Sequence, residues 1–114
     1  MSDRTQPPPN PGAELAIVDN PDERRYEARL GDDLAGWVDY GRVHNRLVAL
    51  HTEVPPRFGG RGIGSALIRR VLDDARAAGL KVTPRCPFFL AHFQRHPEDG
   101  DLVIWPPGVG KGEG

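Results

Sequence analysis

A glycine-rich turn between an apolar stretch and an amphipathic stretch constrains the fold of this chain more than any other feature. The turn covers residues 59–65, with glycine at positions 59, 60, 62 and 64. Residues 47–54 before it are apolar on both alternating faces at their start, which is typical of a central strand covered on both sides. After it, apolar residues recur at helical spacing until Gly79, a natural helix end. The sequence therefore predicts a buried strand, a glycine turn and a helix N-terminus in direct succession.

This succession has the chemistry of an anion-binding site. Glycine lets the backbone approach a ligand closely, and the unpaired N–H groups of a first helical turn favour negative charge. A Walker phosphate loop requires a lysine after its last glycine, but Gly64 is followed by Ser65 and Ala66. The dinucleotide fingerprint requires a glycine at position 65 and a βαβ unit, whereas antiparallel-type strands precede this turn. Both of these loop types are disfavoured, and a pyrophosphate remains a ligand that suits the turn.

The periodicity of the other segments predicts the order of the elements. Residues 25–30 alternate apolar and polar side chains as in a half-buried antiparallel strand, and residues 34–40 continue this pattern. Residues 15–18 and 80–83 are typical of short strands, and Pro87–Arg95 is typical of a second helix. The predicted fold is α/β, more strictly α+β, with a mixed, mostly antiparallel sheet and the order β-β-β-β-α-β-α.

Length and composition predict one globular domain. The chain has 114 residues, of which 38% are hydrophobic and 27% are charged, so it is long enough for one core and too short for two. Residues 1–12 are rich in proline, and residues 106–114 are mainly proline and glycine. We therefore expect a domain over residues 13–105 between two flexible tails.

Charge and cysteine content disfavour several functions. The 15 basic and 16 acidic residues give a formal net charge of -1, so no overall field attracts nucleic acid or an anionic membrane. No apolar run can span a bilayer, and the N-terminus has no hydrophobic signal region. The single cysteine, Cys86, cannot form an internal disulfide. We expect a cytoplasmic protein with a small-molecule partner and with neither a nucleic-acid nor a membrane partner.

The turn also resembles a known cofactor motif. Residues 59–67 are similar to the motif Arg/Gln-x-x-Gly-x-Gly/Ala of the GCN5-related N-acetyltransferases, with Gly62 and Gly64 at its glycine positions. Gly59 then stands where that family prefers arginine or glutamine, and Arg57 or Arg61 could supply the missing charge. A register shifted back by two also fits, but the Ile-Gly-Ser-Ala-Leu sequence that follows favours the first.

Further blocks extend this resemblance over residues 14–104. The blocks at 51–55, 79–82, 84–88 and 96–98 together resemble the small, single-domain, YjdJ-type subgroup of that superfamily. The resemblance implies four antiparallel strands, a helix, a fifth strand and a further helix. It also implies acetyl-CoA as co-substrate, an unidentified amine acceptor, and a pantetheine arm between the strands that carry His51 and Cys86. The cofactor-binding residues that it implies are Val54, Gly59, Gly60, Arg61, Gly62, Ile63, Gly64 and Ser65.

Cys86 and His51 are the candidate catalytic residues. His51 lies two residues after Ala49, which predicts that both occupy one face of the strand, and Cys86 directly precedes the second helix. In the subgroup, this cysteine and histidine resemble an active-site pair. Cys86 could carry the acetyl group, protonate the departing thiolate, or simply pack in the core. Glu53 is a second candidate base.

Two other possibilities follow from the second helix and from the small size of the chain. His92 and His96 stand four residues apart, but a structural zinc site needs four ligands, so we expect no metal. Phe88, Phe89 and Phe93 are expected in the core. A non-catalytic acyl-CoA-binding module remains the alternative to an enzyme, and the chain could be a monomer or a homodimer.

Overall fold

The computed structural model describes residues 14–108. The expected tail over residues 1–12 lies outside the described residues, as do residues 109–114 of the other expected tail. The domain limits of 13–105 therefore stay a prediction. Among the described residues, no helix has both the length and the apolar character that crossing a membrane requires.

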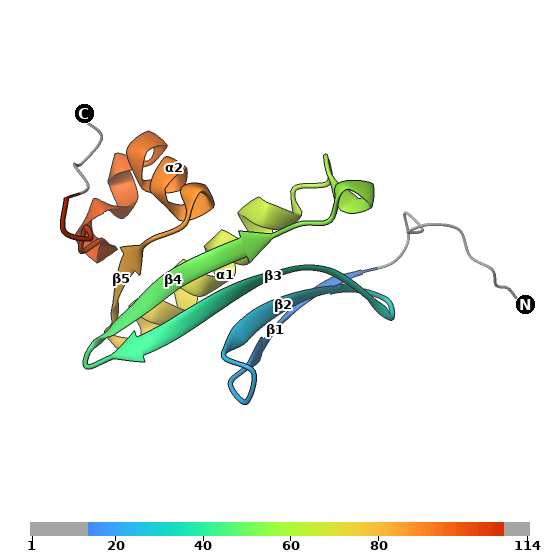
Figure 1. The fold of residues 1–114 in the computed structure, drawn as a ribbon, viewed down its shortest axis with the longest axis horizontal. Coiled ribbons are helices and arrows are strands. Elements are labelled where there is room, and N and C mark those ends of the chain that lie inside the picture. The colour runs from blue at the N-terminus through green and yellow to red at the C-terminus, as the bar shows by residue number, and fades with distance from the viewer. Residues whose placement is uncertain (1–13, 109–114) are drawn as a thin grey trace, which may run out of the picture.

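Five strands form one sheet in their sequence order (Figure 1). Neighbouring strands from β1 to β4 are antiparallel, whereas β5 pairs with β4 in parallel. The predicted order β-β-β-β-α-β-α and the mostly antiparallel sheet are confirmed. The strands are β1 (Leu15–Asn20), β2 (Arg25–Leu30), β3 (Asp33–Val43), β4 (Arg46–Glu53) and β5 (Lys81–Pro84).

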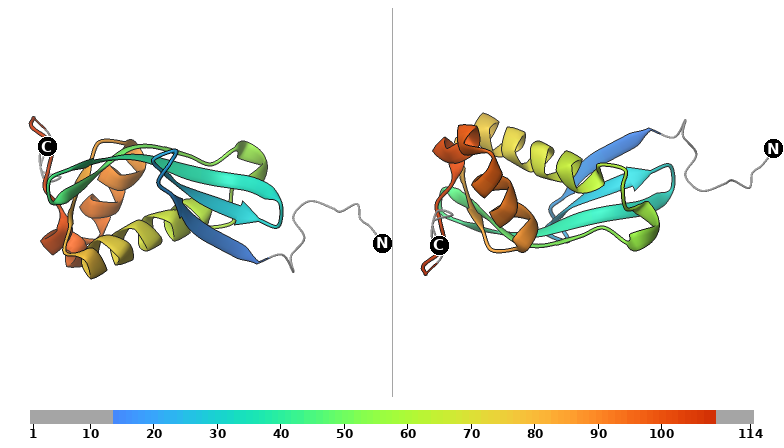
Figure 2. Two further views of the ribbon diagram at one scale, coloured as in Figure 1. Left: turned by 90° about the horizontal axis from the view of Figure 1, so that it is seen from below. Right: turned by 90° about the horizontal axis from the view of Figure 1, so that it is seen from above.

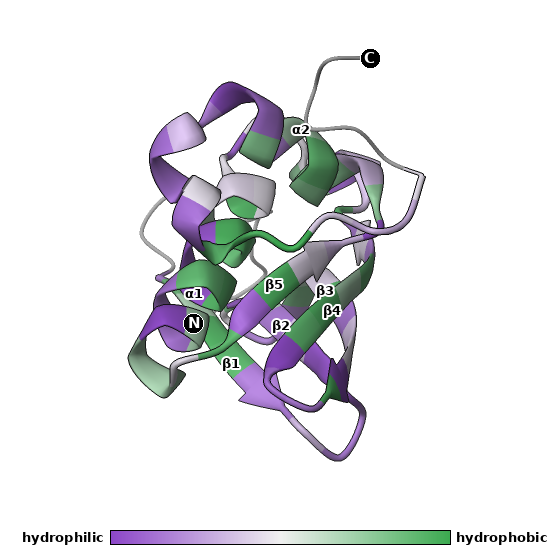
Figure 3. Cartoon of the chain, turned by 90° about the vertical axis from the view of Figure 1, so that its left-hand side faces the viewer, coloured by the Kyte–Doolittle hydropathy of each residue, from purple (hydrophilic) through white to green (hydrophobic). Residues whose placement is uncertain are grey.

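Two α-helices lie on the same side of this sheet (Figure 2). Helix α1 (Ile63–Ala78) is the crossover that a parallel β4–β5 pair requires, and α2 (Pro87–Arg95) follows β5. Short 3-10 helices precede α1, as η1 (Pro56–Phe58), and follow α2, as η2 (Pro97–Leu102). Apolar and polar residues alternate along the turns of α1 (Figure 3), and its buried residues are all apolar: Ile63, Leu67, Ile68, Val71, Leu72 and Ala75.

A bulge in β4 changes which side chains face the helices. Asp39 pairs with His51 and Tyr40 pairs with Ala49, so Leu50 is an extra residue in the ladder. Ala49 is fully buried, but beyond the bulge Thr52 takes the inward position and His51 points outward. The expectation that Ala49 and His51 share a face is therefore wrong, because one inserted residue reverses the alternation along a strand.

The parallel β4–β5 ladder ends halfway along β4. Its last pair joins Ala49 to Pro84, and a backbone N–H of Arg85 still donates to the Ala49 carbonyl at 2.9 Å. β4 continues to Glu53 without a β5 partner, while the chain after β5 turns into α2. The end of β4 and the start of α2 are therefore free to line a common site.

Candidate functional site

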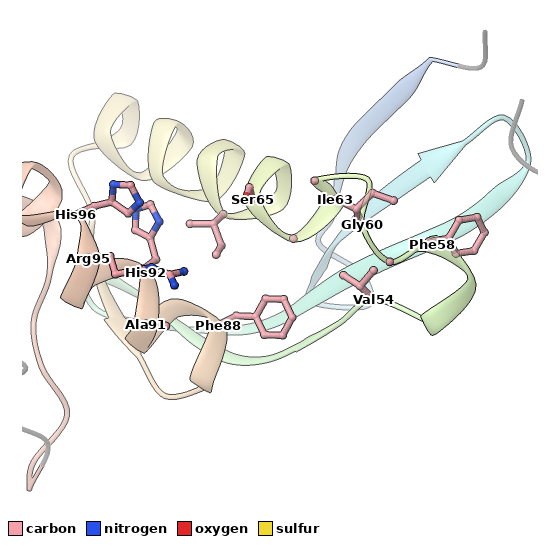
Figure 4. Close-up of a pocket in the computed structure, with 14 residues that line it drawn as sticks. Val54, Phe58, Gly60, Ile63, Ser65, Phe88, Ala91, His92, Arg95 and His96 are labelled. Atoms are coloured by element: carbon pink, nitrogen blue, oxygen red, sulfur yellow. The ribbon is translucent and has the colours of Figure 1, made fainter. Parts of the chain in front are cut away.

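A groove of about 550 Å³ lies between the N-terminal half of α1 and one face of α2 (Figure 4). The end of β4 and the glycine turn close it at one end. Of the sequence-predicted cofactor residues, Arg61 does not line the groove, and the following seven do: Val54, Gly59, Gly60, Gly62, Ile63, Gly64 and Ser65. Tertiary packing thus brings seven of the eight to one cavity.

The turn places an uncapped helix N-terminus at this groove. Gly60 and Gly62 have φ angles of 78° and 76°, in the left-handed region where a side chain is strained. Gly62 is the N-cap of α1, and no side-chain hydrogen bond caps the helix at this end. The first turn of α1 also contains no acidic residue. Its backbone N–H groups are therefore available to an anion in the groove.

Phe88 on α2 forms the opposite wall of the groove. A Cβ added to Gly64 would lie 2.8 Å from Cε2 of Phe88, so glycine at position 64 lets the Phe88 ring lie against the first turn of α1. Phe88 is 43% exposed and lines the groove, whereas Phe89 and Phe93 are buried. The expectation that Phe88 belongs to the core is therefore wrong, and it is confirmed for Phe89 and Phe93.

A second helical face of α2 carries the residues that sequence reasoning missed. Phe88, Ala91, His92 and Arg95 recur at spacings of three and four residues and all line the groove. Their spacing is visible in the sequence, but it runs beside the buried Phe89 and Phe93, which identify a core-facing stripe. The helical spacing of these residues could be read from the sequence, but only the position of α1 shows that this second face of α2 lines a groove.

The two candidate catalytic residues make separate contacts. Cys86 is only 2% exposed, and its Sγ lies 3.3 Å from Oγ1 of Thr52. The His51 ring is 56% exposed, and its Nε2 lies 2.9 Å from Oε1 of Glu53. The structure therefore joins Cys86 to Thr52 on the inner side of β4 and joins His51 to Glu53 on the outer side. Thr52 was not predicted, because nothing in the sequence indicates the bulge that turns it inward.

The comparisons with known proteins agree with this fold. Residues 25–102 match the family described as GCN5-related N-acetyl-transferase. This chain is a member of that family. An NMR solution structure of a GCN5-like N-acetyltransferase candidate from Staphylococcus aureus is 26% identical, with a TM-score of 0.64 over 82% of this chain and 92% of that chain. No curated protein matches the sequence significantly.

One departure from the acetyltransferase motif has a structural consequence. Gly59 occupies the position where the family prefers arginine or glutamine, and neither neighbouring arginine lines the groove. Arg57 lies 3.5 Å from Asp33 and sits over the Phe58 ring, 4.5 Å from its centroid. Arg61 is exposed. Neither arginine next to the turn therefore supplies to the groove the charge that the first position of the motif usually provides.

A buried carboxylate holds α2 against α1. Asp99, in η2, is 4% exposed and accepts hydrogen bonds from Nη2 of Arg69 at 3.3 Å and from Nη2 of Arg76 at 3.0 Å. Its Oδ2 also lies 2.9 Å from Nε2 of His92. Burial raises the pKa of Asp99, but the hydrogen bonds from His92 and Arg69, together with the charge interactions with these side chains, outweigh burial and lower the pKa. The network fixes the His92 ring in the groove wall.

Replacing Asp99 with asparagine should destabilise the fold and remove part of its acid sensitivity. The variant leaves partly buried donors without a charged acceptor, so the free energy of unfolding at pH 7 should fall by about 2 kcal/mol. The folded-state pKa lies below the ordinary value of 3.8. The carboxylate therefore stabilises the fold above that value, and this contribution is lost as the pH falls through the folded-state pKa. Urea titrations at pH 7 and pH 3 measure both effects.

Asp73→Asn is the matched control for this experiment. Asp73 also lies near Arg69, at 3.7 Å, but its side chain is 61% exposed. Surface ion pairs contribute little, so this variant should change the unfolding free energy by less than about 0.5 kcal/mol. Equal losses in the two variants would contradict the role given to the Asp99 network.

Proposed function

We propose that this chain is an acetyl-CoA-dependent N-acetyltransferase of the small single-domain subgroup, which transfers an acetyl group to an amine acceptor. One observation carries the proposal: the uncapped, glycine-bearing N-terminus of α1 opens into a groove that reaches the free end of β4. Such an N-terminus binds phosphate groups through its N–H groups and dipole. Val54, directly after the end of β4, is where a thioester attached to the same cofactor would need a backbone partner.

The proposed reaction is direct transfer of the acetyl group from the CoA thioester, next to Cys86 on the inner face of the sheet, to an amine next to His51 on the outer face. The acceptor nitrogen attacks the thioester carbon, a C–N bond forms and the C–S bond breaks. His51, supported by Glu53 on the outer face, accepts the proton that the amine loses. The Cys86 thiol donates its proton to the departing CoA thiolate, and Thr52 orients that thiol. Solvent then returns a proton to Cys86 and removes one from His51.

Covalent catalysis by Cys86 has less support than this acid role. A nucleophilic cysteine is favoured by a helix N-terminus, which Cys86 has as the N-cap of α2, and by a basic or cationic side chain that favours the thiolate. Among the described residues, the side chain that Cys86 contacts through a hydrogen bond is a neutral threonine hydroxyl. Cys86 and His51 lie on opposite faces of β4 and do not contact each other. This arrangement favours the second candidate function, a non-catalytic acyl-CoA-binding module, over an enzyme with a Cys–His pair.

Acetyl-CoA and CoA should raise the melting temperature, whereas ATP and NAD at equal concentration should not. A ligand that binds only the native state, present at 100 times its Kd, stabilises a domain of this size by about 10 °C. Differential scanning fluorimetry measures the shifts. Equal shifts from ATP would mean that the turn is a general nucleotide site and would contradict the acyl-CoA assignment.

An amine panel then separates an enzyme from a binding module. Thiol release from acetyl-CoA, followed with a thiol reagent, should depend on an added amine. Binding of acetyl-CoA with no thiol release for any polyamine, amino acid, peptide or aminoglycoside would favour the non-catalytic module. Cytoplasmic location and the monomeric or homodimeric state stay predictions, to be tested by fractionation and by light scattering.

A further inference from the structure

The end of the groove farthest from the β4 terminus is basic. His92, Arg95 and His96 lie together at this end, and Ser65 and Phe88 lie between them and the Val54 end (Figure 4). Among the described residues that line the groove, none is acidic and Arg95 is the one arginine or lysine. A groove with an uncapped helix N-terminus and a separate guanidinium is suited to a ligand with two separate anionic groups.

Arg95 differs from its two histidine neighbours in being available to a ligand. His92 is held by Asp99, and Nδ1 of His96 lies 2.9 Å from Oε2 of Glu98. The two imidazole rings stack with their centroids 4.3 Å apart, which fixes the wall beside Arg95. Within residues 14–108, Arg95 makes no ion pair with another side chain. Its charge is therefore not neutralised by the described part of the protein.

The geometry of α2 directs Arg95 back toward the glycine turn. Arg95 follows Phe88 by two helical turns, or about 10 Å along the axis. Long helical side chains lean toward the helix N-terminus, so the guanidinium reaches back along the groove in the direction of Phe88. Phe88 itself contacts the helix turn at Gly64. A ligand group next to a pyrophosphate at the turn therefore lies within the reach of Arg95.

We propose that Arg95 binds the ribose 3′-phosphate of coenzyme A and makes the site selective for CoA thioesters over their dephospho analogues. The inference rests on the proposed function, because it takes the pyrophosphate to lie at Gly62 and Gly64. In coenzyme A a single ribose separates the pyrophosphate from the 3′-phosphate, which matches a groove with an anion site followed by a guanidinium. Arg95 also supplies the cation that Gly59 cannot provide.

Calorimetric titration of the full chain with CoA and with 3′-dephospho-CoA tests this inference. The wild-type protein should bind CoA about tenfold more tightly, because a charge-assisted phosphate–guanidinium contact is lost in the analogue. Arg95→Gln should weaken CoA binding by about tenfold and leave dephospho-CoA binding unchanged. Arg95→Lys should retain part of the preference, since lysine keeps the charge but not the bidentate geometry.

Arg24→Gln is the matched control, because Arg24 is an exposed arginine in the turn between β1 and β2, outside the groove lining. It should keep the full preference for CoA, and melting curves check that each variant is folded. Equal binding of the two ligands to the wild-type protein would overturn this inference alone. A preference that survives in Arg95→Gln would assign the 3′-phosphate to another residue and would also overturn it. If neither ligand binds the wild-type protein, the result contradicts the proposed function and therefore also this inference.

Discussion

Gly64→Glu is expected to abolish the stabilisation by acetyl-CoA while leaving the unliganded protein folded. The new carboxylate would occupy the anion position at the first turn of α1 and would repel a pyrophosphate there. Loss of the charge-assisted phosphate contacts should weaken acetyl-CoA binding by at least about 100-fold. The new Cβ would also push against Phe88, whose exposed ring can move.

The stability of the unliganded variant distinguishes this result from simple misfolding. A glutamate in the first turn interacts favourably with the helix dipole, and replacing a helical glycine removes a propensity penalty of about 1 kcal/mol. These gains offset the crowding at Phe88, so the melting temperature without ligand should be nearly that of the wild type. Gly100→Glu is the matched control, because a Cβ at Gly100 meets no atom within 4 Å and Gly100 lies outside the groove. Undiminished acetyl-CoA binding by Gly64→Glu would contradict a phosphate site at the turn.

Cys86→Ala should lower kcat by about 10²-fold to 10⁴-fold and leave the Kd for acetyl-CoA unchanged. The thiol is proposed to protonate the departing thiolate, a role that general acid catalysts fill with effects of this size. The side chain is small, so its removal should cost only modest stability. Steady-state kinetics with a responsive amine, together with calorimetry, separate the catalytic effect from the binding effect. His51→Ala should show a similar loss of kcat, because the acceptor would lose its base.

Three results would change this assignment of Cys86. An adduct of one acetyl mass on the peptide containing Cys86, after incubation with acetyl-CoA alone, would show a covalent intermediate in place of direct transfer. Full activity in Cys86→Ala would show that Cys86 only packs in the core. Full activity in Cys86→Ser, with loss in Cys86→Ala, would show that only the hydrogen bond with Thr52 matters, since a hydroxyl is a much weaker acid than a thiol.

The local parts of the fold could be predicted from the sequence. The helix over Ile63–Ala78 and the strand before it follow from apolar periodicity, which depends on residues within a few positions of each other. The glycine turn could be predicted for the same reason, since the need for glycine at 60 and 62 is a property of the local backbone. All eight expected cofactor residues lie within residues 54–65 and are therefore close in space wherever the turn lies, but packing against α2 decides that seven of them line the groove.

The bulge at Leu50 is the clearest feature that the sequence does not reveal. An apolar residue at this position fits an uninterrupted strand, and the extra residue exists only because β3 pairs with β4 in two registers. That shift decides that Thr52, and not His51, faces Cys86. Cys86 and His51 could be named from the sequence as candidates, and their catalytic roles stay a prediction, but their contacts could not be predicted because strand register is fixed by pairing between strands.

The sequence by itself determined the order of the elements, the glycine turn and the types of residue that a cofactor site would use. Only the tertiary structure decided that Phe88 and Arg95 line the groove and that Asp99 fixes its wall. Asp99 reaches back to Arg69 and Arg76 over more than twenty residues of chain, and each of these residues taken alone resembles an ordinary surface charge. The physical reason is that helical periodicity determines which residues share a face, whereas the partner of that face depends on packing between elements that are distant in the sequence.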